Sequence, residues 1–364
     1  MPARFTQMPK PELIVHSAMP FNAEPWPADL VGSFLTGTDR FYVRSHGDIP
    51  RLDAATHELT VGGAVAMPLV LPVAELGRRF AVHDVEAVLQ CAGNRRADLQ
   101  PVRPTSGDPW GVGAIGNAVW SGVRLADVLR AAGVREEAGL HVAFGCRDWC
   151  TVDGERFRYG ASIPLNKALA PEVLLVTAMN GAPLTPEHGY PLRVVVPGYA
   201  GVRSPKWLAS ITVQAMPSDN PIQARDYKLL PPDIAPGAVD WSRGFTIDEM
   251  PVNAAICVPA RCATLPAGPT AIKGWAMASS RAIRRVDLSG DGGRHWHQAR
   301  LQHGASPWSW TFWSMTLDLP RGAHELVVRA WDAAGQTQPA APEDTWNCKG
   351  YLSTAWHRVR ITAT

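Results

Sequence analysis

Short apolar runs, separated by glycine, proline and polar stretches, mark the first half of the chain. Residues 57–65 are predicted to form a strand, and residues 85–89 form an apolar run that leads into Cys91. Residues 125–132 have helical spacing, with Gly133 in the position that ends a helix. Apolar, β-branched runs that suit buried strands occur at residues 173–178, 192–196 and 208–213.

The pattern changes in the second half. Residues 215–251 contain many prolines and few apolar runs, which predicts a linker that wraps over a neighbour. Beyond it, strand composition dominates, and Asp291-Gly292-Gly293 predicts a hairpin turn. About seven short strands in this last region fit an immunoglobulin-like sandwich. The runs with strand composition are residues 270–277, 284–289, 308–317, 325–331 and 356–361.

These patterns predict an α+β protein of two domains. Helix and strand interleave in the first half without the regular rhythm of a doubly wound sheet. A chain of 364 residues is long enough for two domains with separate cores. The expected division is a mixed domain at residues 1–245 followed by an all-β sandwich at residues 246–364.

Composition and charge narrow the classes of partner. Hydrophobic residues make up 46% of the chain and charged residues 19%, the balance of a globular protein. A formal net charge of +2 gives no reason to expect nucleic acid or an anionic membrane as the main partner, although a local cation cluster can still bind a small anion. Neither a signal peptide nor a membrane-length apolar segment is recognisable, so the expectation is a cytoplasmic protein, or a periplasmic one if an export signal was removed.

Six cysteines are too sparse for a disulfide framework in a chain of this size. Two close pairs, Cys146/Cys150 and Cys257/Cys262, lack the spacing of zinc or redox motifs, so both pairs are interpreted as buried thiols. Cys91 differs because it ends an apolar strand, enters a glycine turn and precedes Arg95 and Arg96. Nearby arginines favour the thiolate, which is the form that binds soft or high-valent metals. A structural thiol, or a cysteine nucleophile with a positioned histidine, stays open as an alternative.

Residues 188–207 form the second candidate segment. Arg193, Arg203, Lys206 and His188 are interleaved with glycine and proline around one apolar run. Glycine permits close approach of a ligand to the backbone, and arginine or lysine can hold phosphate or another oxyanion. A strand flanked by solvated charges is the other interpretation.

Several motifs, in order, resemble one enzyme family. QCAGNRR (90–96), WGVGAIGNAVWSGVRL (110–125), YGASIPL (159–165), HGYPLRVVVPG (188–198), SPKWL (204–208) and RDYK (225–228) resemble the molybdenum domain of sulfite oxidases and plant-type nitrate reductases. RAIRRVDLSGDGGRHW (281–296), RAWD (329–332) and WNCKGYLSTAWHRV (346–359) are similar to the family's immunoglobulin-like dimerisation domain. The resemblance covers nearly the whole chain, without a preceding haem b5 domain.

The resemblance implies a cofactor and its ligands. In this family one pterin dithiolene (molybdopterin) and one cysteine bind a dioxo-molybdenum centre, and Cys91 matches that cysteine. Soft sulfur donors suit a metal that cycles between Mo(VI) and Mo(IV). The residues that match positions contacting the pterin or its phosphate are Arg44, His46, Asp148, His188, Arg193 and Lys206.

The resemblance also implies an anion pocket. Arg44, Arg96, Trp110 and Tyr227 match the residues that line it, and arginine forks suit an oxyanion. Lys349 departs from the family. Sulfite oxidases have arginine in the string WNLRG and assimilatory nitrate reductases have methionine, whereas this chain reads Trp346-Asn347-Cys348-Lys349-Gly350. Lysine keeps the charge but loses the planar fork, so anion affinity is expected to be weaker or differently oriented.

The expected activity is oxidation of sulfite to sulfate by oxygen-atom transfer, with Arg44, Arg96 and Lys349 holding sulfite. Electrons would pass to an external one-electron acceptor such as a cytochrome c, and the chain would form a homodimer. Three alternatives remain: nitrate reduction, oxidation of another sulfur compound, and a non-catalytic relative that keeps the fold. A simple adhesion or binding module explains only the last third of the chain.

Overall fold

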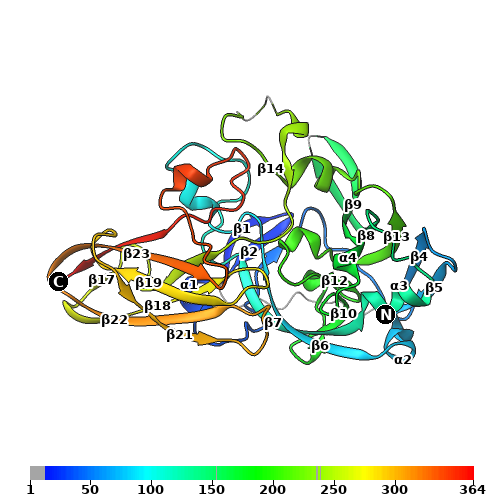
Figure 1. Ribbon diagram of the computed structural model, residues 1–364, viewed down its shortest axis with the longest axis horizontal. Helices are drawn as coiled ribbons and strands as arrows, with labels where there is room; N and C mark the ends of the chain where they lie inside the picture. Colours follow the sequence, from blue (N-terminus) through cyan, green and yellow to red (C-terminus); the bar gives the residue numbers. More distant parts are fainter. Residues whose placement is uncertain (1–12, 153, 235–236, 238) are drawn as a thin grey trace.

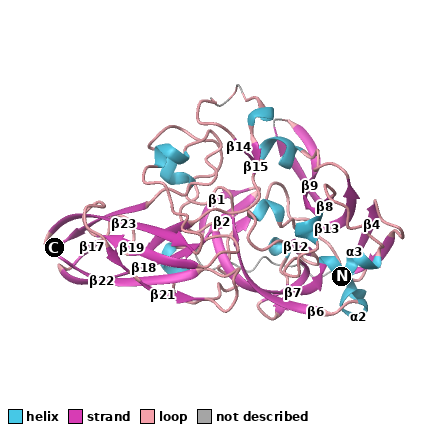
Figure 2. Ribbon diagram, in the orientation of Figure 1, coloured by secondary structure: helices cyan, strands magenta, loops and turns pink. Residues whose placement is uncertain are grey.

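The computed structural model describes residues 13–152, 154–234, 237 and 239–364. Mixed sheets with short helices form one end of the molecule, and a β-sandwich that carries the C-terminus forms the other (Figure 1). Strands and loops dominate throughout (Figure 2). The longest α-helix among the described residues, α3 (Leu125–Ala131), has seven residues. Within these limits, no helix has the length and apolar character needed to cross a bilayer.

Two five-stranded sheets form most of the N-terminal part. The strands of the first are β6 (Val82–Gln90), β7 (Ile115–Arg124), β10 (Leu174–Met179), β11 (Ala182–Pro183) and β12 (Arg193–Val195). Those of the second are β4 (Glu58–Gly63), β5 (Leu69–Pro72), β8 (His141–Val152), β9 (Glu155–Pro164) and β13 (Leu208–Gln214). The first has the order β11–β10–β7–β6 with β12 also on β10, and the second β5–β4–β13–β8–β9. Within these two sheets, β4 and β13 form a parallel pair and the other pairs are antiparallel.

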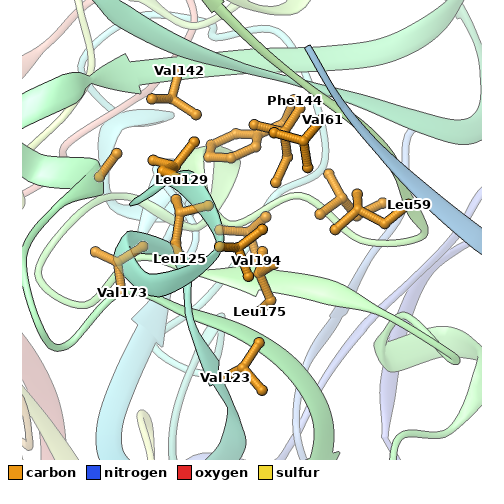
Figure 3. Packing of buried hydrophobic residues seen from close by; sticks show 14 of the residues in the cluster. Leu59, Val61, Val123, Leu125, Leu129, Val142, Phe144, Val173, Leu175 and Val194 are labelled. Carbon is orange, nitrogen blue, oxygen red and sulfur yellow. The ribbon is translucent and has the colours of Figure 1, made fainter. Parts of the chain in front are cut away.

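Helix α3 joins these sheets through one hydrophobic core (Figure 3). Leu125, Val128 and Leu129 recur at helical spacing and are fully buried against residues of β4, β8 and β10. Each such side chain contributes roughly 1.5–3 kcal/mol on burial. The helix ends where predicted, because Gly133 has φ +71° and continues the chain in a conformation that other residues disfavour.

The remaining elements are short. They are α1 (Pro27–Leu30), α2 (Leu76–Arg79), α4 (Leu165–Ala168), the sheet of β1 (Ile14–Ala18), β2 (Phe21–Glu24) and β3 (Val43–Arg44), and the pair β14 (Lys228–Leu229) and β15 (Phe245–Thr246). Single turns of other helix types occur at Val73–Glu75, Arg96–Leu99, Pro186–His188, Gly201–Arg203, Ile222–Asp226, Trp241–Arg243 and Pro342–Thr345. The predicted linker is thus a mostly irregular segment, whose turn at Ile222–Asp226 contacts β9.

The C-terminal end is a sandwich of two sheets. One has the order β16–β18–β22–β21 and the other β17–β24–β23–β19–β20. Their strands are β16 (Asn253–Val258), β17 (Thr264–Leu265), β18 (Gly268–Met277), β19 (Ile283–Ser289), β20 (His297–Gln298), β21 (Arg300–His303), β22 (Thr311–Leu319), β23 (Gly322–Asp332) and β24 (His357–Ala363). Apolar residues of both sheets share one core, including Ile272, Val286 and Val328.

The fold agrees with most of the expectations from sequence. The α+β class is confirmed, and each predicted strand run in the first half falls on a strand. The sandwich has seven strands of four or more residues plus the two-residue β17 and β20, which are too short to leave a sequence pattern. Asp291-Gly292-Gly293 does turn the chain between β19 and β20. The division at residues 245/246 stays a prediction.

One cysteine prediction was wrong. Cys146, Cys150 and Cys257 are buried, but Cys262 is exposed. Cys262 lies between β16 and β17 with φ +63°, and its backbone N–H donates to the carbonyl of Arg360. The turn geometry therefore decides its exposure, not the apolar character of the thiol.

Candidate functional site

A cavity in the N-terminal part brings together residues from distant segments. Its empty space, including the solvent at its mouth, is about 640 Å³. The predicted site residues that line it are Arg44, His46, Cys91, Asp148, His188, Arg193, Lys206 and Tyr227. They come from β3 and the loop after it, the end of β6, β8, β12 and the turns around residues 188, 206 and 227.

Cys91 lies at the floor of this cavity, directly after β6. Its backbone N–H donates to the carbonyl of Ala114, which anchors the end of the strand, and the turn that follows, at residues 92–95, contains Gly93. The N–H of Gly93 donates to the Cys91 sulfur at 3.4 Å. Burial raises the pKa of the Cys91 thiol, while Arg44 and Arg96 oppose that effect. The thiol is therefore protected from solvent but surrounded by groups that stabilise its anion.

Arg193 and Lys206 form a buried cationic wall. The guanidinium of Arg193 donates to the carbonyls of His188 at 2.9 Å and Ser204 at 3.0 Å. The ammonium of Lys206 donates to the carbonyl of Glu187 at 2.8 Å and to Ser45 Oγ at 3.2 Å. Burial lowers the pKa of Arg193 to about 10, and burial together with Arg193 lowers the pKa of Lys206. These hydrogen bonds go to neutral oxygens, so an anion would relieve the cost of burying both cations.

His46 and Tyr227 meet across the cavity. His46 Nε2 lies 2.7 Å from the hydroxyl oxygen of Tyr227. Burial lowers the pKa of His46, with Arg44 and Lys206 adding to the shift, so the imidazole is neutral. Burial also raises the pKa of Tyr227 to about 12 against the field of Arg44, so the phenol keeps its proton. The Tyr227 ring stacks on Tyr351 with 4.9 Å between centroids, which ties it to the C-terminal part.

Asp148 and His188 complete the part of the site that the sequence predicted. Asp148 Oδ1 is buried without a hydrogen-bond partner among the described residues. Burial raises the pKa of Asp148 to about 6, although Lys206 acts in the opposite direction. An N–H donor from a bound molecule would satisfy this oxygen. His188 is buried, with Nε2 3.1 Å from the carbonyl oxygen of Thr38.

Arg96 does not line the cavity, but it acts on the pKa of the Cys91 thiol and its side chain is held in a fixed position. Its Nε donates to the carbonyl of Lys349 at 2.9 Å and its Nη1 to that of Asp108 at 2.7 Å. Three glycines surround the side chain, and a Cβ at Gly93, Gly107 or Gly350 would lie 2.6–2.8 Å from its atoms. Loops from both ends of the molecule therefore position this guanidinium.

Besides Arg96, two predicted anion-pocket residues do not line the cavity. Trp110 is fully buried, and its ring packs edge-on against His16 with 4.7 Å between centroids. The side chain of Lys349 pairs with Asp226, Nζ to Oδ1 3.2 Å, and only its backbone carbonyl reaches Arg96. Local motif matching placed both residues at the site, but packing of the segments around them directs the two side chains elsewhere.

Other lining residues were missed by sequence reasoning. Tyr42 and Ser45 lie on the same short segment as the predicted Arg44 and His46. Tyr159 also lines the cavity, and its hydroxyl donates to the carbonyl of Val202. The motif YGASIPL contains Tyr159, so this residue was within reach of sequence reasoning. Tyr42 and Ser45 carry no comparable signal, because a tyrosine and a serine beside a short strand are common.

The residues present fit the molybdenum–pterin cofactor implied by the resemblance. Cys91 offers one buried sulfur, and no group of three or more His, Cys, Asp or Glu side chains that could hold a metal occurs in the described part of the chain. Arg193 and Lys206 offer charge to a phosphate, and Asp148 offers an unpaired acceptor to a pterin N–H. The donor set suits an anionic, nitrogen-rich cofactor with its own metal ligands.

Comparison with known proteins points the same way. Residues 46–222 match the oxidoreductase molybdopterin binding domain family, and residues 244–364 match the Mo-co oxidoreductase dimerisation domain family. The chain is 43% identical over 96% of its length to sulfite oxidase from Gallus gallus, and it spans 77% of that protein. It is 37% identical over 94% of its length to an NAD(P)H nitrate reductase from Hordeum vulgare, of which it spans 41%.

A solved structure shares the fold over almost the whole chain. The sulfane dehydrogenase SoxCD from Paracoccus pantotrophus superposes with a TM-score of 0.80 at 26% identity, covering 94% of this chain and 84% of that one. The mixed sheets and the sandwich of this chain therefore have the same arrangement as in that sulfane dehydrogenase.

Proposed function

Because the chain belongs to the sulfite oxidase family of molybdopterin oxidoreductases, we propose that it oxidises sulfite to sulfate in the Cys91 cavity. The observation that carries the proposal is a buried thiol lining a cavity whose walls hold two cations that donate to neutral oxygens. When bound there, the molybdenum–pterin cofactor supplies two-electron oxygen-atom transfer. The residues of this chain bind that cofactor and the oxyanion.

Cofactor binding is assigned to one face of the cavity. Cys91 provides the thiolate for the metal, and Arg193 and Lys206 provide charge for the cofactor's phosphate. Asp148 accepts a hydrogen bond from the pterin through Oδ1, and His188 and His46 complete the wall. Binding replaces the neutral partners of the two cations with an anion, which makes retention of the cofactor favourable.

The substrate side is assigned to Arg44, Arg96 and Tyr227. Arg44 lines the cavity, and Arg96, which is not among the lining residues, adds positive charge close to Cys91. Arg44 binds the sulfite oxyanion, the charge of Arg96 stabilises it, and the protonated Tyr227 hydroxyl can donate to one of its oxygens. Because these groups are fixed before substrate arrives, little reorganisation accompanies the reaction. Lys349 acts only through its backbone and through Asp226 in this arrangement.

The test compares wild type with Cys91→Ser after expression in a host that makes molybdopterin. Wild type is expected to contain molybdenum and to reduce ferricyanide with sulfite, and Cys91→Ser is expected to lose at least about a thousandfold of that turnover. Cys262→Ser, which removes an exposed thiol outside the site, is the matched control and should retain full activity. Bound molybdenum without sulfite turnover in wild type would overturn the assigned substrate, and no molybdenum would overturn the cofactor assignment.

Nitrate reduction is the second candidate, supported by the similarity to a plant nitrate reductase. The higher identity to sulfite oxidase, 43% against 37% for the nitrate reductase, favours sulfite. Assaying nitrate reduction on the same preparation decides between them, because a nitrate rate above the sulfite rate would reverse the order of the two candidates.

The partners follow from the same assignment. The match to a dimerisation domain at residues 244–364 supports a homodimer, which sedimentation at micromolar concentration would test. Electrons leave for an external one-electron acceptor, with a cytochrome c as the first acceptor to try. Cytoplasmic localisation, or periplasmic localisation with an export signal, stays a prediction.

A further inference from the structure

An exposed tryptophan is surrounded by arginines on the hairpin formed by β8 and β9. Trp149 is 41% exposed, which is unusual for a side chain of its size. The guanidinium carbon of Arg158 lies 4.0 Å from the centre of its ring, and that of Arg156 lies 4.5 Å from it. Arg147 is also exposed, two residues before Trp149 on the same strand. We call Arg147, Trp149, Arg156 and Arg158 the hairpin face.

The hairpin face lies directly behind the cavity. Side chains alternate along a strand, so Asp148 points to the side opposite Arg147 and Trp149. The burial of β8 follows this alternation, and Asp148 lines the cavity. Arg158 is close enough to act on the pKa of Asp148. Only one strand therefore separates the redox site from the solvent at this point.

The charge of the hairpin face is available to a partner. Glu155, the acidic neighbour described on β9, is paired with Arg225 rather than with Arg147, Arg156 or Arg158. No ion pair is formed by these three arginines within the described part of the chain. Tryptophan and arginine are the residue types that often contribute most of the binding free energy at protein interfaces.

We propose that the hairpin face is the docking surface for a one-electron carrier protein with an acidic surface around its redox centre. This inference rests on the proposed function, because oxidation of sulfite and water to sulfate releases two electrons and two protons. Each carrier accepts one electron, so two carriers dock in turn for every sulfite. Arginines steer the acidic carrier by charge, and Trp149 provides the apolar contact.

The test uses holoenzyme at saturating sulfite with two protein acceptors of opposite charge. Plastocyanin, an acidic blue-copper protein, should be reduced with a higher kcat/KM than mitochondrial cytochrome c, a basic protein, and its rate should fall steeply with salt. Arg147→Glu combined with Arg156→Glu should lower kcat/KM for plastocyanin about tenfold and raise it for cytochrome c. Trp149→Ser should lower kcat/KM for plastocyanin severalfold without changing the salt dependence of that rate.

The control variant combines Arg78→Glu with Arg79→Glu, two exposed arginines on α2, and should leave both acceptors unchanged. Binding of reduced plastocyanin, measured by calorimetry at low salt, gives a second measure that does not depend on turnover. The rate at which sulfite alone reduces the enzyme should be equal in all variants. If that rate is absent in wild type, the proposed function fails, whereas a normal rate with unchanged plastocyanin kinetics in the hairpin variants overturns the docking surface.

Discussion

Buried charged groups have different partners in the sandwich and in the cavity of this molecule. In the sandwich, Arg285 and Arg329 donate to the fully buried carboxylate of Asp287, at distances between 2.7 and 3.3 Å. In the cavity, Arg193 and Lys206 donate to neutral oxygens. Asp287 raises the pKa of Arg285, whereas burial lowers the pKa of both cavity cations.

This difference in hydrogen-bond partners distinguishes charged groups that stabilise the fold from charged groups that bind a ligand. A cation beside a buried carboxylate is neutralised within the chain, and removing either partner leaves an uncompensated charge. A desolvated cation that donates only to neutral oxygens destabilises the free protein, although Asp148 and Glu187 offset part of this cost at Lys206, and an anion that binds there makes the cation favourable. Substitutions in the two clusters should therefore change stability in opposite directions.

The largest expected effect is in the sandwich. Asp287→Asn leaves Arg285 and Arg329 facing a neutral amide and should lower the free energy of unfolding by about 2 to 4 kcal/mol, the lower part of the usual range because Arg285 is half exposed. Urea denaturation measures this change. Asp318→Asn, at an exposed position of β22, is the control and should change stability by less than about 0.5 kcal/mol. If Asp287→Asn and Asp318→Asn lower the free energy of unfolding equally, the arginine–carboxylate cluster of the sandwich does not stabilise the fold.

Gly350→Ala tests whether the sandwich end positions an arginine of the cavity. Gly350 has φ +61°, and its added Cβ would lie 2.6 Å from Arg96 Cγ. The KM for sulfite should rise about tenfold, equivalent to about 1.4 kcal/mol, with molybdenum content unchanged. Gly335→Ala introduces the same backbone strain at φ +77° with nothing within 4 Å of the new Cβ, so it should leave KM unchanged. A parallel rise in both variants would show that backbone strain alone is responsible.

Part of the pH dependence of stability should come from His357 on the sandwich side. His357 Nδ1 accepts the N–H of Ile256 at 3.0 Å, and burial lowers the pKa of His357 to about 3. An unfolded histidine has a pKa of about 6.5, so between these values the unfolded state binds one more proton. The free energy of unfolding should therefore fall on acidification below about pH 6.5, by up to about 1.4 kcal/mol per pH unit. Urea unfolding at pH 7.5, 6.5 and 5.5 measures the slope.

His357→Gln is the matched variant for this slope. A glutamine oxygen can accept the same backbone N–H but does not titrate. The variant should lose the part of the slope due to His357, while the other histidines still contribute theirs. Identical slopes in wild type and variant would assign the acid sensitivity elsewhere.

The smallest expected effect carries the opposite sign. Lys206→Met removes a desolvated cation from the cavity and should stabilise the cofactor-free protein by about 1 kcal/mol, or leave it unchanged. For a chain of this size, that corresponds to a rise in Tm of roughly 2 °C. Molybdenum content after expression with the cofactor should fall. Lys273→Met, an exposed position on β18, should affect neither quantity. A loss of stability as large as that of Asp287→Asn would contradict the comparison.

The sequence by itself determined the local structure and most of the site. Spacing of Leu125, Val128 and Leu129 with Gly133 specifies α3, because helix formation and termination depend on neighbours along the chain. The structure brings to one cavity five residues of the ordered motifs, including Cys91 and Lys206, and three that the family resemblance implied outside them. These motifs are informative because each combines a chemical group with the glycine or proline that its local backbone requires.

Tertiary packing alone decided the directions of several side chains and what lies across from them. Trp110 is turned into the core, Lys349 onto Asp226, and Tyr351 beneath Tyr227, although all three lie in or beside matched motifs. The exposure of Cys262 and the arginine-framed Trp149 likewise depend on a turn and on strand pairing between β8 and β9. Such features are absent from the sequence pattern because they depend on segments far apart in the chain, whose contacts exist only after the sheets have assembled.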